Sequence, residues 1–425
     1  MKLRFIHIFM LSICSVQLSC AQPINSAAQP IENIAVAKNN ITTGAERLAT
    51  YLPLLKGKKV AIFANQTSVV GHTHLVDTLL NAGINIVKIF GPEHGFRGNA
   101  DAGEEINNSV DKKTGIPIIS LYGNHKKPTT EDFKNVDVLV FDIQDVGVRF
   151  YTYISSLEYF LEAALEMHKP LLILDRPNPN GFYIDGPVLN KKFKSFVGMQ
   201  PVPIVYGMTI GEYTHLSKFQ LPVNPSPNLK QMQSIYLYPT TCFFEGTVLS
   251  EGRGTNIPFQ VFGHPKLPNN LPYSFTPKPN AGAKNSKCFY QLCYGWNLGG
   301  TNAEVLAMLD RKIQLKYLIQ AYNLFPGKDS FFLKNNFIDK LAGTDQLQQQ
   351  IKQGLQEEEI RKSWEPELGN FKSIRKNICC MKILNNSFRS LIWDQQSADP
   401  YIILTMYAPI SSPENRRAGT LNSGN

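Results

Sequence analysis

Short apolar runs alternate with longer amphipathic segments between about residues 58 and 181. Four runs are apolar almost throughout, which predicts strands that are buried on both faces, and two segments between them have the apolar spacing of helices. Strands that alternate with helices in this way form βαβ units and a parallel sheet. The strand runs are "KKVAIFANQT", "INIVKIFGPEHG", "VDVLVFDIQDVG" and "PLLILDRPNPNG", and the helical segments are "HLVDTLLNAG" and "SLEYFLEAALEMHK".

The pattern changes from about residue 224, where proline and aromatic residues become more frequent. The stretch "LYPTTCFFEGTVLSEGRGTNIPFQVFGHP" has the composition of short strands and loops. "KYLIQAYNLFPGK" and the segment that begins "IKQGLQEEEIRKSW" contain helical patterns. We therefore predict an α/β domain over residues 44–223, a smaller α+β domain over residues 224–377, and a tail over residues 378–425 that fits neither pattern.

The N-terminus has the pattern of a secretory signal peptide. Lys2 and Arg4 precede an apolar core that is too short for a membrane span, and small residues follow it. This predicts a cleaved signal over residues 1–21, a linker over residues 22–43, and an exported, periplasmic protein. Cys20 leaves a second outcome open, in which this cysteine carries a lipid anchor. No later stretch is long and apolar enough to span a bilayer.

Composition and charge narrow the class of protein. Hydrophobic residues make up 43% and charged residues 18%, which is ordinary for a globular chain. The formal charge of +9 is spread without a Lys/Arg block, so nothing indicates a nucleic-acid partner. Five of the seven cysteines follow the predicted signal, and this odd number argues against a full disulfide framework. Two alternatives remain for these residues: a disulfide between Cys288 and Cys293, or buried thiols.

Each predicted strand of the first domain ends in a cluster of polar residues. The carboxyl ends of parallel strands lie along one edge of an open sheet, and ligands bind at this edge. We therefore expect the clusters to build the functional site. They are Asn65-Gln66-Thr67, Glu93-His94, Asp142-Gln144-Asp145 and Asp175-Arg176-Asn178.

Glu93 and His94 follow a Gly-Pro turn at the end of the second strand. Glu93 could act as general acid or base on a bound substrate, or it could be a surface carboxylate of the turn. His94 could orient Glu93, bind substrate or ligate a metal. Alternatively, it could have a purely structural role. Glu104 lies in the loop that follows and could fold back over this pair.

The segment "FDIQDVGVRFYTY" is the second candidate part of the site. Alternation in an extended chain would place Asp142 and Gln144 on one face, and Asp145, Arg149 and Tyr151 extend the polar run. A sugar site combines carboxylates, amide and guanidinium donors, and aromatic rings. The alternative for Asp145 and Arg149 is a salt bridge between them.

Two further pairs are candidates for binding. Asp175 and Asn178 flank a proline that stiffens the end of the fourth strand, although either could simply cap a turn or helix. Glu251 and Arg253 stand between glycines in "SEGRGT", where a donated site residue from the second domain is expected.

Several catalytic motifs are absent from the sequence. It contains no GxGxxG after a strand, no GxxxxGK[ST], no HExxH and no GxSxG. The sequence therefore lacks the motifs that usually indicate a dinucleotide-binding protein, a nucleoside-triphosphate hydrolase, a zinc protease or a serine hydrolase. Glycosidase chemistry, which needs a proton donor and a second group opposite it, requires neither a cofactor nor a metal.

Five motifs resemble the NamZ family of exo-β-N-acetylmuramidases over residues 44–377. They are "FGPEHGFRGNADAGE", "FDIQDVGVRFYTY", "LDRPNPNG", "YPTTCFFEGTVLSEGRGT" and "QLCYGW". The resemblance implies a Rossmann-like domain, a smaller C-terminal domain and a cleft between them. It also implies removal of non-reducing terminal N-acetylmuramic acid (MurNAc) from peptidoglycan fragments, the MurNAc–GlcNAc saccharides.

The resemblance also assigns roles to the candidates. Glu93 becomes the general acid, and Asp145 or Glu104 could activate water. Alternatively, the acetamido group of the substrate could attack, with a carboxylate to orient it. The lactyl carboxylate and the sugar hydroxyls would be held by Arg149, Tyr151, Asn178 and Arg253, since an arginine fork can bind both carboxylate oxygens.

The chain departs from the family in two places. A helix–strand unit is missing after Tyr213, and the tail after residue 377 resembles read-through sequence. A muropeptide-binding protein with impaired catalysis is therefore one alternative. A hydrolase that binds a metal through Glu93, His94, Asp142 and Asp145 is another.

Overall fold

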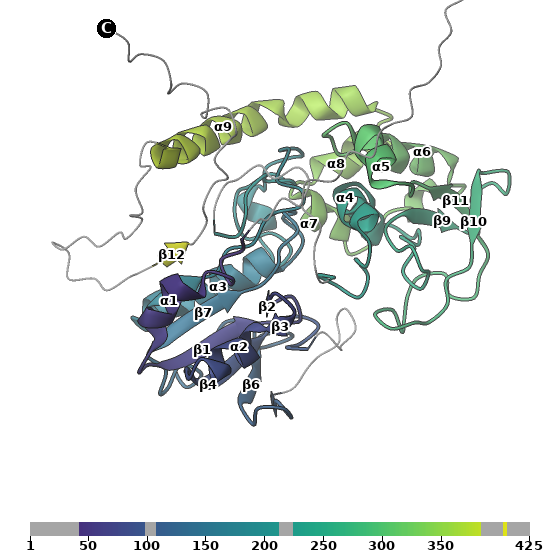
Figure 1. Cartoon of the computed structure of the whole chain (residues 1–425). Coiled ribbons are helices and arrows are strands. Elements are labelled where there is room, and N and C mark those ends of the chain that lie inside the picture. The colour runs from purple at the N-terminus through teal and green to yellow at the C-terminus, as the bar shows by residue number, and fades with distance from the viewer. Residues whose placement is uncertain (1–41, 98–107, 212–223, 384–402, 406–425) are drawn as a thin grey trace, which may run out of the picture. The chain divides into compact units, whose positions relative to one another are not determined.

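The computed structural model describes residues 42–97, 108–211, 224–383 and 403–405 (Figure 1). The described residues from 42 onward group as one compact unit. The predicted signal peptide, with Cys20, lies outside the described residues. So does the point after Tyr213 where the helix–strand unit is predicted to be missing.

The first domain is built on a mostly parallel sheet with the strand order β12-β8-β7-β1-β4-β6-β5. The parallel strands β6-β4-β1-β7-β8 follow the order 3-2-1-4-5 of doubly wound folds. Strand β12 extends this order beside β8, and it comes from the predicted tail. The strands are β1 (Lys59–Ala64), β4 (Asn85–Gly91), β5 (Ser109–Val110), β6 (Pro117–Ser120), β7 (Val138–Asp142), β8 (Leu171–Ile173) and β12 (Ile403–Thr405).

Helices cover the sheet on both faces, as the continuous apolar strands predict. Phe63 of β1 packs in one core cluster with helix α3 (Tyr153–Glu166). Ile62, its neighbour on β1, packs in the other cluster with α1 (Leu48–Leu55) and α2 (Leu75–Asn81). Successive strand residues thus alternate between two cores, which confirms the α/β class of this domain.

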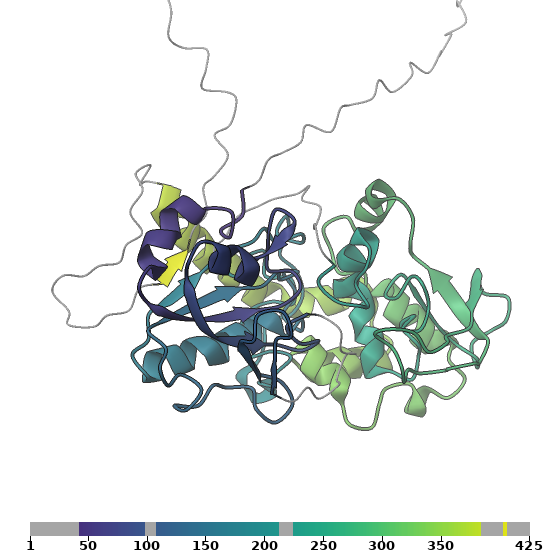
Figure 2. The same cartoon turned by 60° about the horizontal axis from the view of Figure 1, so that its bottom comes forward.

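The C-terminal domain combines helices with a three-stranded antiparallel sheet of order β10-β11-β9 (Figure 2). This confirms the α+β prediction. Helix α9 continues beyond residue 377, the predicted domain end. The elements are α4 (Met232–Thr241), β9 (Val261–His264), β10 (Tyr273–Phe275), β11 (Cys293–Asn297), α5 (Asn302–Leu309), α6 (Lys316–Leu324), α7 (Phe337–Ala342), α8 (Gln346–Lys352) and α9 (Glu357–Ile383).

One predicted stretch has a different structure. The residues from Leu237 to Gly246 were expected to form short strands and loops, but they continue helix α4 and form the 3-10 helix η2 (Cys242–Gly246). Nine of the ten α4 residues are buried, so the helix has no polar face and its sequence lacks the helical period. The prediction was wrong because a helix that is buried on all sides resembles a strand in sequence.

Smaller elements complete the fold. No helix within the described residues is both long and apolar enough to cross a membrane. The short elements are β2 (Val69–Val70), β3 (Thr73–His74) and the 3-10 helices η1 (Lys191–Phe193) and η3 (Lys328–Ser330).

Candidate active site

Glu93 lies directly after strand β4 and is half-buried. The Tyr122 hydroxyl donates to Glu93 Oε1 at 3.0 Å, and the Thr152 hydroxyl donates to Oε2 at 3.3 Å. Tyr122 follows strand β6, and Thr152 precedes helix α3, so neighbouring parts of the sheet edge hold this carboxylate. A carboxylate that is oriented by two hydroxyls and still partly exposed can exchange a proton with a bound ligand.

His94 is held in an unusual backbone conformation, with φ of +69°. Few residues other than glycine adopt this region, and they do so at an energetic cost that the surrounding structure must offset. The ring is buried, and its Nε2 lies 3.3 Å from the hydroxyl of Ser226. His94 therefore joins the end of β4 to the chain segment that leads into the C-terminal domain.

That segment also bonds residues that follow β1 and β7, the two strands between which the strand order of the sheet reverses. The Pro225 carbonyl accepts hydrogen bonds from the Tyr151 hydroxyl at 2.8 Å, from Gln66 Nε2 at 3.2 Å and from the Tyr153 hydroxyl at 3.4 Å. Tyr151 is buried as a result. The protein's own backbone therefore bonds side chains at the reversal point, where doubly wound folds usually bind ligands.

Asp145 is buried at 3% exposure and has no ion pair with Arg149 among the described residues. Its Oδ2 accepts from the Tyr206 hydroxyl and, at 2.6 Å, from the Gly147 amide. Its Oδ1 has no hydrogen-bond partner within the described chain. Burial raises the pKa of Asp145 to about 6, although the bonds from Tyr206 and Gly147 oppose this shift.

Asp142 pairs with Arg176 in the interior. Arg176 Nε and Nη2 donate to the two Asp142 carboxylate oxygens at 2.6 and 2.8 Å, and neither side chain is more than 2% exposed. Arg176 also donates to the Val69 carbonyl at 2.9 Å. The pair links the end of β7 to the end of β8, and in this arrangement Asp142 presents no oxygen to a ligand.

Arg149 is also buried, with 1% exposure, and it bonds only main-chain oxygens. Its Nη1 donates to the Pro187 and Val202 carbonyls at 2.9 and 2.7 Å. Its Nη2 donates to Leu341 and Ala342 of helix α7 at 3.0 and 2.7 Å. Burial lowers the pKa of the guanidinium to about 9. This side chain therefore ties the first domain to α7 instead of facing a cleft.

The remaining polar residues of the strand ends hold turns together. Gln144 Nε2 donates to the Pro177 carbonyl at 2.6 Å. The Asp175 carboxylate accepts from the Arg176 amide at 3.0 Å and Asn178 Oδ1 accepts from the Asn180 amide at 2.8 Å, and these local bonds are of the kind that the turn-capping alternative describes. Asp175 also accepts from the distant Thr209 hydroxyl at 2.6 Å, and the Asn178 amide donates to a main-chain carbonyl at 2.7 Å. All three side chains at the strand ends are buried, so the sheet edge brings them together without exposing them.

Glu251 and Arg253 belong to an ion cluster of the C-terminal domain. Arg253 contacts Glu245 at 2.6 Å and Glu251 at 3.3 Å, and Lys287 contacts Glu251 at 2.8 Å. Burial alone would raise the pKa of Glu251, but Lys287 and Arg253 hold it below its usual value. The Arg253 side chain keeps 21% exposure, so it is the more accessible of the two candidates.

The sequence did not single out three residues that contact the candidate pair, namely Tyr122, Thr152 and Ser226. Tyr122 follows strand β6, whose four residues contain only a short apolar run, so the pattern contains no clear signal for its place at the sheet edge. Glu104 lies outside the described residues. Within the part of the chain that is described, no three His, Cys, Asp or Glu side chains group as a metal site.

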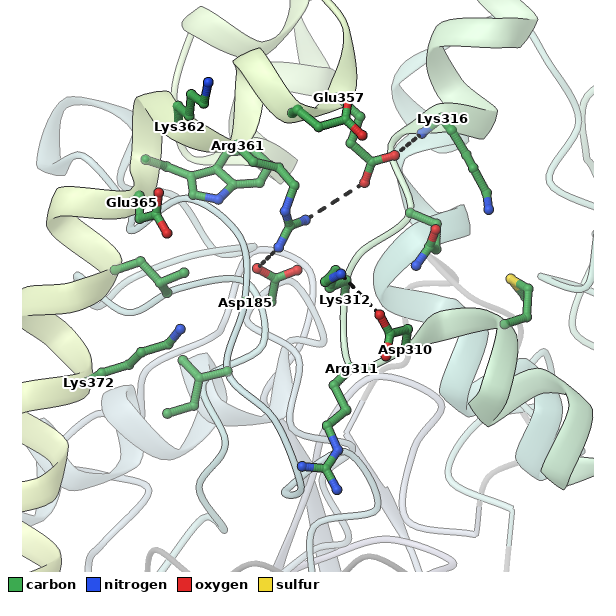
Figure 3. A pocket seen from close by; sticks show the side chains of 16 residues that line it. Asp185, Asp310, Arg311, Lys312, Lys316, Glu357, Arg361, Lys362, Glu365 and Lys372 are labelled. Carbon is green, nitrogen blue, oxygen red and sulfur yellow. Dashed lines mark hydrogen bonds and ion pairs between the residues drawn. The ribbon is translucent and has the colours of Figure 1, made fainter. Parts of the chain in front are cut away.

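A groove of about 690 Å³ lies elsewhere, along helix α9 (Figure 3). None of the predicted site residues lines it. Arg361 of α9 contacts Asp185 of the first domain at 2.5 Å, and Glu357 accepts from the Lys316 amide at 2.8 Å. These contacts attach α9 to its neighbours on both sides of the groove.

Two family models match the chain in succession. Exo-beta-N-acetylmuramidase NamZ, N-terminal, matches residues 60–234, and its C-terminal counterpart matches residues 236–380. The chain is 38% identical over 387 residues to the peptidoglycan beta-N-acetylmuramidase NamZ of Bacillus subtilis (strain 168), covering 80% of this chain and 91% of the relative.

Two solved structures from Bacteroides fragilis, both described as DUF1343 family proteins, have the same fold. One has a TM-score of 0.72 and 43% identity, covering 80% of this chain and 98% of the other. The second has a TM-score of 0.64 and 28% identity, covering 79% and 98%. From the matched domains and the sequence identity it follows that the chain belongs to the NamZ family of exo-β-N-acetylmuramidases.

Proposed function

We propose that this protein is an exo-acting β-N-acetylmuramidase, which releases the non-reducing terminal MurNAc from peptidoglycan fragments. The observation that carries the proposal is Glu93, a half-buried carboxylate between the Tyr122 and Thr152 hydroxyls, in a chain that matches both NamZ domains. A relative with 38% identity carries the name of this activity, which supports its assignment here.

Hydrolysis of a glycosidic bond needs a proton on the leaving oxygen. Glu93 donates this proton, and Tyr122 and Thr152 then stabilise the carboxylate that forms, because hydroxyl donors favour the charged group. The second catalytic group has three candidates. The burial of Asp145 and its bond to Tyr206 set it back from bound water, which favours Glu104 or the acetamido group of the substrate itself.

Recognition of the lactyl carboxylate requires a cation with an accessible surface. Arg149 is buried and both of its Nη atoms donate to carbonyls, whereas Arg253 retains an exposed part beside Glu245 and Glu251. We therefore favour Arg253 over Arg149 as the residue that contacts the carboxylate.

We infer the site of action from the pattern of the N-terminal sequence. A signal over residues 1–21 would deliver the protein to the periplasm, where peptidoglycan fragments occur, and Cys20 would anchor it if a lipid is attached. The mass of the N-terminal peptide of the mature protein tests both points.

The activity is tested with residues 22–425 and two substrates, para-nitrophenyl β-MurNAc and its GlcNAc counterpart. We expect release from the MurNAc compound only. Glu93→Gln should lower kcat at least about 100-fold, because the proton donor is gone, while the melting temperature stays within a few degrees. Near-normal turnover by this variant would remove Glu93 from the mechanism.

Two other outcomes separate the alternatives. A folded protein that binds muropeptides without turnover would be the impaired binder, and the segment predicted to be missing after Tyr213 would be the first explanation to test. Loss of activity in a chelator, restored by a divalent cation, would support the metal-dependent hydrolase.

A further inference from the structure

A row of aromatic side chains leads away from Glu93. Tyr122, whose hydroxyl bonds Glu93 Oε1 at 3.0 Å, has its ring 6.5 Å from that of Phe196. The Phe196 ring stacks on that of Tyr159 at 6.2 Å with an angle of 12° between the planes. All three residues are half-buried, so the row begins at the candidate catalytic carboxylate and reaches the surface.

Three separate parts of the fold supply these rings. Tyr122 follows β6, Tyr159 belongs to α3, and Phe196 follows the 3-10 helix η1. None of the three belongs to the two hydrophobic core clusters or to the half-buried apolar residues packed on them. The core does not account for this alignment, and half-exposed rings of this kind commonly bind a ligand that has one apolar face.

A cation lies over one ring of the row. The Lys126 ammonium is 5.3 Å from the centre of the Phe196 ring and donates to the Gly123 carbonyl. A pyranose ring presents C–H groups on its faces and hydroxyls around its rim. Aromatic rings with a polar donor beside them match both features.

Part of the surroundings of Glu93 is taken up by the protein itself. The Pro225 carbonyl accepts hydrogen bonds from the Tyr151 and Tyr153 hydroxyls, and Ser226 contacts His94. An exo-acting enzyme must also hold the part of the glycan beyond the terminal sugar. The half-buried row offers rings for this purpose, because it begins at the Tyr122 hydroxyl that bonds Glu93.

We propose that Tyr122, Phe196 and Tyr159 form the subsite for the leaving part of the substrate, where the N-acetylglucosamine ring next to the scissile bond stacks. This inference rests on the proposed function, since it takes the bond to be cleaved at Glu93. It adds the residues that recognise the N-acetylglucosamine ring on the leaving side of the scissile bond.

The test compares two substrates that differ only in the leaving group, the disaccharide MurNAc–GlcNAc and the β-fluoride of MurNAc. Fluoride is too small to reach the row. In Phe196→Ala, the ratio of kcat/KM for the disaccharide to kcat/KM for the fluoride should fall at least about fivefold, the effect of losing one substantial contact. Phe196→Tyr, which keeps the ring, should restore the ratio.

Phe193→Ala is the matched control. Phe193 is also half-buried, lies three residues away, and has the Lys192 ammonium 4.9 Å from its ring. It has no ring contact with the row among the described residues, so its ratio should stay within twofold of the unmodified protein. An equal loss on both substrates in Phe196→Ala would mean a purely structural role and would overturn the proposal, as would an unchanged ratio.

Failure of the proposed function gives a different result, because the unmodified protein would then hydrolyse neither substrate. Calorimetric titration of MurNAc–GlcNAc into the unmodified protein and into Phe196→Ala decides the subsite in that case. At least about fivefold weaker binding by the variant would support the aromatic subsite, and equal affinity or no binding would overturn it.

Discussion

The ion pair of Asp142 and Arg176 gives the sharpest test of which polar residues at the strand ends are structural. The change is Asp142→Asn, which keeps the shape of the side chain and removes its charge. Arg176 is 2% exposed and would then hold a buried guanidinium without its anion. Removing one partner of a buried ion pair destabilises a protein by about 3–5 kcal/mol.

The double variant Asp142→Leu/Arg176→Met tests whether the loss of stability comes from the unpaired charge. It removes both charges and leaves the Val69 carbonyl, which Arg176 bonds at 2.9 Å, without its donor. An apolar replacement of a buried pair is often close to neutral, so we expect most of the lost stability to return, apart from about 1–3 kcal/mol for that carbonyl.

Guanidinium unfolding followed by far-ultraviolet circular dichroism measures these changes. For a chain of this size, 3–5 kcal/mol corresponds to a fall of roughly 4–6 °C in melting temperature. Lys134→Met is the control, because Lys134 and Glu131 form a pair with 64% and 79% exposure, and its loss should change stability by less than about 1 kcal/mol. A normal melting temperature for Asp142→Asn together with lost turnover would refute the structural role and return Asp142 to the active site.

Three further predictions follow from burial. Folding raises the pKa of Asp145 from 3.8 to about 6, so its carboxyl stabilises the fold fully below about pH 4 and this contribution is lost as the pH rises through 6. Relative to Asp145→Asn, the unfolding free energy of the unmodified protein should therefore fall by up to about 3 kcal/mol between pH 4 and 7, and parallel stability curves would contradict this. A hydrogen bond from the Cys293 thiol lowers the pKa of Cys288, whereas burial raises that of Cys242. Iodoacetamide should accordingly label Cys288 before Cys242 in the native protein, as peptide mass spectrometry can follow, and the reverse order would be inconsistent with this packing. Arg149→Met should destabilise the fold by at least about 3 kcal/mol, because four carbonyls lose their donor. An unchanged denaturant midpoint for this variant would show that the bonds from Arg149 to α7 do not stabilise the fold.

The sequence predicted the sheet well because its strands have a simple signal. Strands β1, β4, β7 and β8 are buried on both faces, and a continuous apolar run shows this directly. It predicted the place of Glu93 for the same reason, since the residue follows a strand whose end is unmistakable. Helix α4 was not predicted, because burial on all sides removes the period that marks a helix.

The direction in which a polar side chain points could not be predicted in the same way. Asp142, Gln144, Asp175 and Asn178 stand at the strand ends as expected, yet each is turned into the protein and bonded there. Sequence position places a residue at the edge of the sheet, whereas its partner comes from a distant part of the chain. The Met208 carbonyl that binds Asn178 is 30 residues away, for example.

The buried polar residues give the motifs that resemble the family a structural role. In "FDIQDVGVRFYTY", Arg149 bonds helix α7 nearly two hundred residues along the chain, and Tyr151 bonds the Pro225 carbonyl at the entry to the C-terminal domain. A polar side chain buried at such a junction loses its hydration and must find every partner within the protein, so substitution there is expensive. The motif thus maintains the junction of the two domains. Ser226 of the same junction lies 3.3 Å from His94 Nε2, so the bonds that hold the two domains together also fix the residue next to Glu93.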